Sequence, residues 1–378
     1  MRAIQMVDLK TEYQRLKKEI DTAVIDVIES AAFINGKPVQ DFSKALAEYL
    51  AVKHVIPCAN GTDALQIAMM ALGLQAGDEV ITPSFTYIAT TEVVALLRLK
   101  PVFVEVDKQT FNIDMESLRK AITSKTRAIV PVHLYGQSCD MEALMQVANE
   151  FNLAVIEDNA QSIGGDYYFK NGTTKKAGTI GTIGTTSFYP AKNLGAYGDA
   201  GAMFTNDDAL AQKLTMIANH GQSKRYYHDV VGCNSRLDTI QAAILNIRLK
   251  HLDENINARI KVADHYDAAF EGHPIIKTPF KANNNRHVFH QYTLILDGDK
   301  KGLRDALSTH LTEKKVPNMI YYPVPGHRQK MFETFGGLEC DLPVTDWLTE
   351  RVISLPIHPE LDEEQLRYIT QSVLDFFK

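Results

Sequence analysis

The sequence holds few cysteines and no long run of apolar residues. Its four cysteines, Cys58, Cys139, Cys233 and Cys340, lie far apart and form no CxxC pair. Such spacing is typical of free thiols in a reducing compartment and disfavours a disulfide framework. No segment approaches the run of about 20 apolar residues that a membrane span needs, and the N-terminus lacks the apolar stretch of a signal peptide. We therefore expect a cytoplasmic protein without a membrane span.

An excess of positive charge is also missing. The 378 residues include 40 lysines and arginines against 46 aspartates and glutamates, a formal net charge of −6. Nucleic-acid-binding proteins usually carry a basic face or stripe, so we expect no nucleic-acid partner. An anionic small substrate is compatible with this charge, because a local pocket on an acidic protein can be positive. With 45% hydrophobic residues, the chain can bury a large core without disulfides.

Short apolar runs alternate with helical patterns in the first part of the chain. An amphipathic helix is expected over residues 8–30, where Ile20, Val24, Val27 and Ile28 recur at helical spacing. Beyond it the pattern predicts strands at 54–57, 79–82, 101–106, 127–132 and 153–157, and helices at 62–72, 86–97, 115–122 and 140–151. This alternation favours an α/β fold with a mostly parallel sheet covered by helices. Ligands usually bind where the strands of such a sheet end.

The second half of the sequence is less regular. Residues 178–205 are rich in glycine, threonine and serine with short strand-like pieces, and long helical patterns follow over residues 236–269. The stretch 273–286 has little periodicity and carries two prolines and three consecutive asparagines. We expect a smaller C-terminal α/β domain that begins there or just before it. We divide the chain into a large domain, residues 1–250, and a small domain, residues 251–378.

Four segments carry residues suited to chemistry, and the first is a turn of small residues. Ala59-Asn60-Gly61-Thr62-Asp63 stands between an expected strand and an expected helix. The backbone N–H groups at a helix N-terminus converge there with the helix dipole, so an anion such as phosphate can bind. Thr62 adds a hydroxyl. The alternative is an ordinary helix cap.

The second segment is Val155-Ile156-Glu157-Asp158-Asn159-Ala160-Gln161-Ser162. It puts two acids at the end of a buried strand, where either Glu157 or Asp158 can hold a protonated ring nitrogen. The alternative is a loop carboxylate that caps the next segment.

The third segment places a single lysine, Lys192, in a loop of small and aromatic residues. Ser187 lies five positions before it, and Gly195, Gly198 and Gly201 follow. A lysine shielded from water loses its proton more easily and can then attack a carbonyl to form a Schiff base. The alternative, a solvated surface lysine, describes most lysines, but the crowding of glycines and aromatic residues favours the reactive interpretation.

The fourth segment is Gly232-Cys233-Asn234-Ser235-Arg236-Leu237-Asp238. Arg236 can grip a carboxylate with its planar guanidinium. The alternative is a structural ion pair with Asp238 or another acid.

The order and spacing of the four segments resemble the nucleotide-sugar aminotransferases of the DegT/DnrJ/EryC1/StrS family, of fold type I. The resemblance runs from Ile4-Gln5-Met6-Val7-Asp8-Leu9 to Ser354-Leu355-Pro356-Ile357-His358-Pro359. The segments CANGTDALQIA, EVITPSFTYIAT, PVHLYGQ and CNSRLDTIQAAIL are most similar to one subgroup. Its members aminate carbon 3 of UDP-2-acetamido-2-deoxy-3-oxo-glucuronate, with glutamate as donor. They serve the synthesis of bacterial surface polysaccharide, including lipopolysaccharide and its O-antigen.

The resemblance implies pyridoxal 5′-phosphate (PLP) as the cofactor, no metal ion and a homodimer with shared active sites. It implies that Lys192 binds PLP covalently and that Asp158 pairs with the ring nitrogen. The other implied cofactor contacts are Gly61, Thr62 and Ser187 at the phosphate, Tyr87 on the ring, Gln161 near the ring hydroxyl, and Asn234, donated by the other subunit, at the phosphate. Arg236 and Tyr321 are the implied substrate contacts.

Two positions depart from the family pattern. Tyr321 stands where close relatives have histidine, and Asn159 stands where alanine is more usual. Rival hypotheses are an aminotransferase for another 3- or 4-keto-sugar, a sugar dehydratase, and a non-catalytic ligand-binding regulator on the same fold. Dehydratases of the family carry histidine in place of the lysine, and a regulator is expected to lose the lysine or the acid. Lys192 and Asp158 are both present, which disfavours these two hypotheses.

Overall fold

The computed structural model describes residues 2–298, 300–335 and 339–378. A seven-stranded sheet forms its centre, in the order β1-β9-β8-β5-β4-β2-β3. The strands are β1 (His54–Cys58), β2 (Glu79–Pro83), β3 (Lys100–Val104), β4 (Thr126–Ile129), β5 (Ala154–Asp158), β8 (Ile183–Ser187) and β9 (Gly201–Thr205). β9 pairs antiparallel with β1 and β8, and the other pairs are parallel. The predicted mostly parallel sheet is confirmed.

Helices cover both faces of this sheet because successive strand residues point to opposite sides. Val80 and Ile156 pack into a core with α3 and α7, whereas Ile81 and Val155 pack into a core with α5 and α6 on the other face. The helices of the two faces are α3 (Gly61–Ala71), α4 (Ala89–Leu96), α5 (Met115–Ala121), α6 (Met141–Glu150) and α7 (Asp208–Ala218). The short 3-10 helix η1 (Leu134–Gly136) and the hairpin of β6 (Asp166–Tyr168) and β7 (Thr174–Lys176) complete this part.

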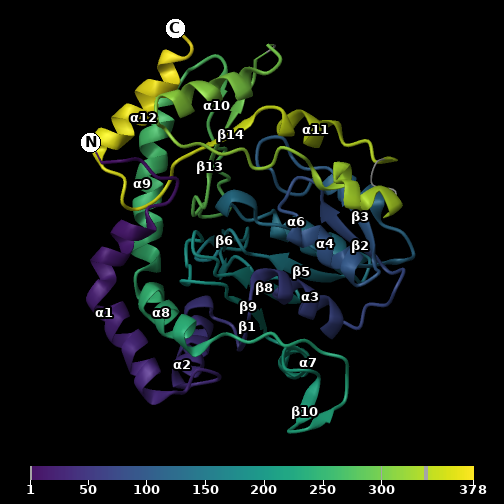
Figure 1. Cartoon of the computed structure of the whole chain (residues 1–378). Coiled ribbons are helices and arrows are strands. Elements are labelled where there is room, and N and C mark those ends of the chain that lie inside the picture. The colour runs from purple at the N-terminus through teal and green to yellow at the C-terminus, as the bar shows by residue number, and fades with distance from the viewer. Residues whose placement is uncertain (1, 299, 336–338) are drawn as a thin grey trace.

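Two N-terminal helices pack beside the sheet against α8 (Thr239–Lys250) (Figure 1). α1 (Leu9–Ser30) begins at Asp8, whose side chain accepts a hydrogen bond from the Thr11 N–H at 3.0 Å. α2 (Lys37–Leu50) was not predicted from the sequence. It is amphipathic, and its apolar face buries Phe42 and Leu46 completely against α8 and the central sheet.

The C-terminal part has a small antiparallel sheet in the order β12-β13-β14. Its elements are α9 (Leu252–Phe270), β12 (Ile276–Lys277), β13 (Tyr292–Leu296), α10 (Leu303–Glu313), η2 (Gly326–Arg328), η3 (Lys330–Phe335), α11 (Pro343–Thr349), β14 (Val352–Leu355) and α12 (Glu363–Asp375). α9 contributes to two cores: Ile256 packs with α2, and Tyr266 packs with the small sheet. The division into residues 1–250 and 251–378 stays a prediction.

The expected helices and strands of the first 158 residues are all present, and their ends differ by a few residues. The helix predicted from residue 86 begins at Ala89, because residues 84–88 form a loop after β2. The strand predicted over 127–132 ends at Ile129. The helical stretch predicted over 236–269 is two helices that meet at His251. Within the described residues, no helix combines the length and apolar character that a bilayer crossing requires.

A buried ion pair ties the N-terminal helix to the rest of the chain. Arg248 of α8 and Glu12 of α1 are 4% and 6% exposed, and Arg248 Nη2 lies 2.7 Å from Glu12 Oε2. Arg248 Nη1 also donates to the carbonyl oxygen of Gly195, in the loop that carries Lys192. The pair therefore links α1, α8 and the lysine loop.

Replacing one partner of this pair should destabilise the fold strongly. Glu12→Ala leaves the Arg248 charge buried without its carboxylate, which costs about 3–5 kcal/mol. Urea unfolding followed by circular dichroism measures the loss. The matched control is Asp41→Ala, which breaks an exposed ion pair with Lys37 on α2 and should cost about 0–1 kcal/mol. Equal losses in the two variants would contradict the structural role of the buried pair.

Candidate active site

A cavity of about 850 Å³ opens at the carboxyl ends of the central strands. β5 ends at Asp158 and β8 ends at Ser187, and both residues line the cavity together with the first turn of α3. This is the edge of the sheet where the alternating pattern predicted a ligand. The predicted residues that line it are Gly61, Thr62, Tyr87, Asp158, Gln161, Ser187, Lys192 and Tyr321.

The turn at the start of α3 forms one wall. Asn60 is the N-cap residue, and its side chain accepts a hydrogen bond from the Asp63 N–H at 2.8 Å. Gly61 packs so closely on β8 that a Cβ atom there would lie 2.6 Å from the Ser187 Cβ. The backbone N–H groups of the first helical turn have no acceptor within the helix. The turn, together with the Ser187 hydroxyl, therefore suits a phosphate group.

Asp158 faces the cavity from the end of β5. It is 6% exposed. Its Oδ2 accepts a hydrogen bond from the Thr90 hydroxyl at 2.7 Å, and its Oδ1 accepts one from the Ala160 N–H at 3.1 Å. Its backbone pairs with Pro131 and His133. The carboxylate is thus held in one orientation with lone pairs left for a ligand.

Glu157, the other acid of the motif, has a different place. It is fully buried, and it accepts hydrogen bonds from the N–H groups of Gly178 and Ile180 and from His133 Nε2, at 2.9, 2.6 and 2.8 Å. It does not line the cavity. The sequence did not show which of the two acids faces a ligand. In the structure only Asp158 lines the cavity.

Asn159 also turns away from the cavity. Its Nδ2 donates to the Ala177 carbonyl oxygen at 2.9 Å, and its side chain packs on Gly178, where an added Cβ would lie 2.7 Å from Nδ2. Its departure from the usual alanine thus affects the loop before β8.

Lys192 projects from the loop after β8. Its N–H donates to the Tyr189 carbonyl oxygen at 2.8 Å, and its neighbours Leu194 and Ala196 are fully buried. Burial lowers the pKa of the Lys192 ammonium to about 8, although the nearby charge of Asp158 opposes this shift. Among the described residues that line the cavity, it is the only lysine or arginine. A lysine with these properties suits Schiff-base chemistry.

A segment of the C-terminal part closes the cavity. Gln161 accepts a hydrogen bond from the Tyr135 N–H at 2.8 Å and donates one to the Tyr322 hydroxyl at 3.1 Å. The Tyr135 hydroxyl donates to the Tyr321 carbonyl oxygen. Tyr87 is 57% exposed, and its ring centroid lies 6.1 Å from that of Tyr322. Gln161 thus connects the loop after β5 to Tyr135 and Tyr322.

The structure does not bring Asn234 and Arg236 to the cavity of the same chain. Asn234 forms a β-bridge with Asn219, and Arg236 Nη1 donates to Asn219 Oδ1 at 3.4 Å. The Ser235 hydroxyl between them accepts a hydrogen bond from the Ala59 N–H at 3.0 Å. The segment therefore packs against the residue that precedes the turn at the start of α3. No described acid forms an ion pair with Arg236, so the structural alternative of a pair with Asp238 is not observed.

The sequence analysis missed several cavity residues, among them Tyr189, Asp199, His290, Gln291 and Tyr322. His290 and Gln291 come directly before β13, in a region where the sequence showed only a domain junction. Burial lowers the pKa of His290 well below its usual value, and the charges of Lys192 and Arg259 act in the same direction. Tyr322 could have been predicted as a cavity residue, because it neighbours Tyr321. Nothing in the sequence indicated His290 and Gln291, since their position depends on how the two sheets meet.

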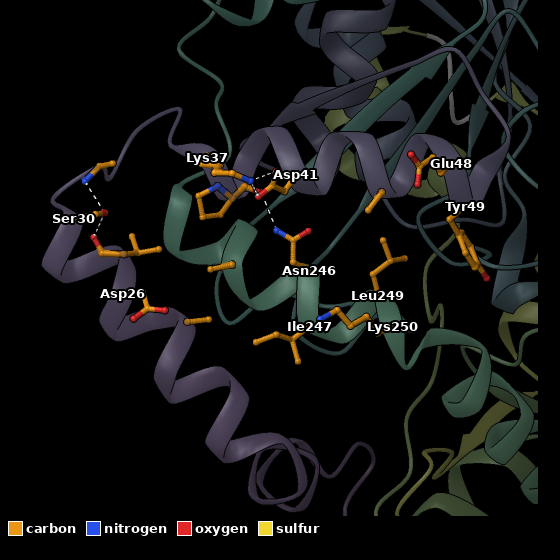
Figure 2. Close-up of a pocket in the computed structure, with 16 residues that line it drawn as sticks. Asp26, Ser30, Lys37, Asp41, Glu48, Tyr49, Asn246, Ile247, Leu249 and Lys250 are labelled. Carbon is orange, nitrogen blue, oxygen red and sulfur yellow. Dashed lines mark hydrogen bonds and ion pairs between the residues drawn. The ribbon is translucent and has the colours of Figure 1, made fainter.

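A second cavity, also of about 850 Å³, lies between α1, α2 and α8 (Figure 2). Some of its polar groups are paired within the chain: Lys37 pairs with Asp41, and Asn246 Nδ2 donates to the Pro38 carbonyl oxygen at 2.9 Å. Its lining comes only from these helices and the connection between α1 and α2. We assign no chemistry to it.

A model of the DegT/DnrJ/EryC1/StrS aminotransferase family matches residues 14–374. The chain belongs to this family. Its relatives include a "pleiotropic regulatory protein" of Geobacillus stearothermophilus, 44% identical over 99% of both chains. A UDP-2-acetamido-2-deoxy-3-oxo-D-glucuronate aminotransferase of Pseudomonas aeruginosa is 44% identical over 97% of this chain and 98% of that one. A UDP-N-acetyl-3-dehydro-alpha-D-glucosamine 3-aminotransferase of Acidithiobacillus ferrooxidans is 43% identical over 97% and 96%.

Solved structures agree with this membership. S. venezuelae DesV, in complex with a ketimine intermediate, superposes with a TM-score of 0.94 at 37% identity, over 100% of this chain and 99% of that one. The ntda protein of Bacillus subtilis, with bound cofactor PMP, gives 0.87 at 31% identity, over 95% and 81%. The predicted fold type, the class of PLP-dependent nucleotide-sugar aminotransferase and the cofactor are confirmed.

The lowered pKa of Lys192 should govern how fast the cofactor attaches. Only the neutral amine attacks the PLP carbonyl, and a pKa of about 8 in place of 10.5 makes that form available at lower pH. Stopped-flow mixing of cofactor-free protein with PLP should therefore give a rate constant that rises with pH and has its midpoint near 8. Lys192→Ala, the control, should show no such covalent phase. A midpoint near 10.5 would contradict the burial of the amine.

Proposed function

We propose that the chain transfers the amino group of L-glutamate to carbon 3 of UDP-linked 2-acetamido-2-deoxy-3-oxo-glucuronic acid, a step in bacterial surface-polysaccharide synthesis such as that of the lipopolysaccharide O-antigen. The reaction type is supported by one observation: a partly buried lysine and an oriented carboxylate, Lys192 and Asp158, line the same cavity. The substrate rests on the 44% identity to the Pseudomonas aeruginosa enzyme named for it.

The described residues fit PLP. The Gly61-Thr62 turn and Ser187 would hold its phosphate, Tyr87 would stack on its ring, and Gln161 would lie near its hydroxyl. When bound, PLP supplies an electron sink for the carbon that carries the amino group. Gly61 has to be glycine for this cradle, because a Cβ atom would collide with Ser187.

Two side chains carry the chemistry in this proposal. Asp158 would hold the protonated ring nitrogen, because its carboxylate is oriented by Thr90 and Ala160 and keeps lone pairs free toward the cavity. Lys192 holds the cofactor between turnovers and, once released by glutamate, moves the proton from the glutamate Cα as general base and acid. With the keto-sugar bound, Lys192 would move a proton in the opposite direction, onto carbon 3, as the amino group passes from the cofactor to that carbon and the keto oxygen leaves as water. Burial favours this role, since it keeps the amine ready to lose its proton.

The charge of the cavity supports a homodimer. Lys192 faces three acids among the described lining residues, Asp63, Asp158 and Asp199. A phosphate and two substrate carboxylates need more positive charge than one lysine supplies. We infer that a second copy provides Asn234 for the phosphate and Arg236 for the carboxylates of glutamate and the uronic acid.

Exposed apolar side chains near this segment support the same inference. The hairpin of β10 (Gln222–Lys224) and β11 (Tyr227–His228) extends away from the body of the chain (Figure 1). Tyr226 and Tyr227 of the hairpin and Val231 after it are 77%, 63% and 84% exposed. Phe33 and Ile34, also exposed, pair through their backbone with Thr239 and Asp238. Apolar surface of this kind marks an interface.

Two other functions have a specific observation in their favour. The Acidithiobacillus ferrooxidans relative, at 43% identity, is named for a sugar without the uronic carboxylate, so a neutral 3-keto-sugar is the nearest alternative substrate. The Geobacillus stearothermophilus relative is named as a regulator. A non-catalytic regulator does not need a lysine with a lowered pKa beside an oriented carboxylate, and this chain retains both.

The identity of the sugar substrate can be tested in the reverse reaction, in which the stable amino-sugars donate their amino group to the cofactor. The UDP-linked 2-acetamido-3-amino-glucuronate should bleach the visible band of the PLP-loaded protein. The neutral 3-amino-glucose analogue should react about 10- to 100-fold more slowly, because it lacks the charge-assisted contact of the carboxylate. A UDP-linked 4-amino sugar should not react. Faster reaction with the neutral or the 4-amino compound would replace the proposed substrate.

The shared site is tested by mixing inactive variants. If Arg236 serves the partner's cavity, a dimer of one Lys192→Ala chain and one Arg236→Ala chain has one intact site. Equal mixing after subunit exchange should restore about a quarter of the wild-type activity. The control mixture of Lys192→Ala and Asp158→Asn should stay inactive, because both residues belong to the cavity of their own chain. No recovery in the first mixture, with exchange shown by tagged chains, would contradict the shared site.

A further inference from the structure

A threonine behind the cavity contacts the carboxylate of Asp158. Thr90 lies in the first turn of α4 and is 1% exposed. Its hydroxyl donates to Asp158 Oδ2 at 2.7 Å. Thr90 is absent from the residues that line the cavity, whereas Tyr87 and Ala89, on either side of the helix start, do line it. Thr90 can therefore act on a ligand only through the cavity residues that its hydroxyl contacts, and Asp158 is the charged and closer of these.

The direction of this hydroxyl is unusual for the start of a helix. Threonines in helices generally bond to a carbonyl oxygen of their own backbone. The neighbouring Thr91 does so: its hydroxyl donates to the Ile88 carbonyl oxygen at 3.1 Å. Thr90 instead reaches from α4 across to β5. Thr86, one turn earlier, lies with its hydroxyl 3.4 Å from that of Thr90.

Asp158 has few other restraints on its side chain. Its Oδ1 accepts the Ala160 N–H at 3.1 Å, and no ion pair among the described residues involves it. A carboxylate offers about four lone-pair sites. One on each oxygen is therefore occupied by these two donors, and the others are free to accept a proton-bearing group in the cavity.

We propose that Thr90 is a positioning residue, whose hydroxyl fixes the plane of the Asp158 carboxylate so that its free lone pairs can accept the N–H of the protonated ring nitrogen of the cofactor. This inference rests on the role proposed above for Asp158. Without Thr90 the carboxylate can rotate out of the plane in which it meets the ring nitrogen. Its hold on the ring proton then weakens, so that the ring loses its positive charge more easily.

The visible absorption of the PLP-loaded protein reports this charge. A positively charged ring disfavours a proton on the nitrogen that joins the cofactor to Lys192, so losing the ring charge moves the titration of that nitrogen to higher pH. Thr90→Val removes the hydroxyl and keeps the shape. Its titration midpoint should rise by roughly one pH unit, the size expected for one hydrogen bond to a charged group. Its kcat should fall about tenfold with little change in KM.

Two matched variants separate this role from packing. Thr90→Ser keeps the hydroxyl and should retain the wild-type midpoint. Thr91→Val removes an equally buried hydroxyl from the same helical turn, one that does not contact Asp158, and should also retain it. A wild-type midpoint in Thr90→Val, or an equal shift in Thr91→Val, would overturn the proposal. If Thr90→Val fails to hold PLP, Thr90→Ser decides: a wild-type midpoint supports the hydroxyl, and a shifted one contradicts it.

Asp158→Asn separates the role of Asp158 from that of Thr90. It should move the midpoint further than Thr90→Val does. If Asp158→Asn leaves the titration unchanged, the role proposed for Asp158 fails. If Asp158→Asn moves it and Thr90→Val does not, only the inference on Thr90 fails.

Discussion

The site depends on how β5 ends. Successive residues of a strand point to opposite sides, so the adjacent acids Glu157 and Asp158 face in opposite directions. Glu157 is buried and joins His133 to the backbone of the loop before β8. This network anchors the strand end from one side, and Asp158 is left at the cavity with its carboxylate held by Thr90 and Ala160. One register shift of β5 would exchange the two roles.

The position of Lys192 depends on a second anchor, farther from the cavity. The loop that carries it is bonded through Gly195 to Arg248, and Arg248 is paired with Glu12 of the N-terminal helix. The loop that carries the lysine is thus held in place by α1 and α8, and its buried residues shield the lysine from water. Its shielding lowers the pKa of its ammonium, and this property connects the packing of the N-terminal helices to the chemistry.

Local patterns in the sequence predicted most of this arrangement. The apolar runs of β2 and β5 are short and continuous, as is typical of buried parallel strands, and Asn60-Gly61-Thr62 marks the start of α3. The lysine loop was recognisable from its glycines and aromatic residues.

Other features depend on contacts between distant segments. Whether Glu157 or Asp158 faces the cavity follows from the pairing of β5, and the presence of His290 and Gln291 follows from the approach of the small sheet. The antiparallel direction of β9 and the whole of α2 were not predicted either, since tertiary packing decides them. Arg236 was predicted by resemblance, and its distance from the cavity of its own chain is visible only in the fold.

If Lys192 and Asp158 make this cavity a PLP-dependent aminotransferase site that takes its amino group from glutamate, the purified, PLP-loaded protein should respond to L-glutamate in its visible spectrum. We expect the absorption band to bleach and one equivalent of 2-oxoglutarate to be released per site. A neutral amino acid should cause neither change. A band that persists under saturating glutamate, or bleaching without 2-oxoglutarate, would contradict this role of the cavity.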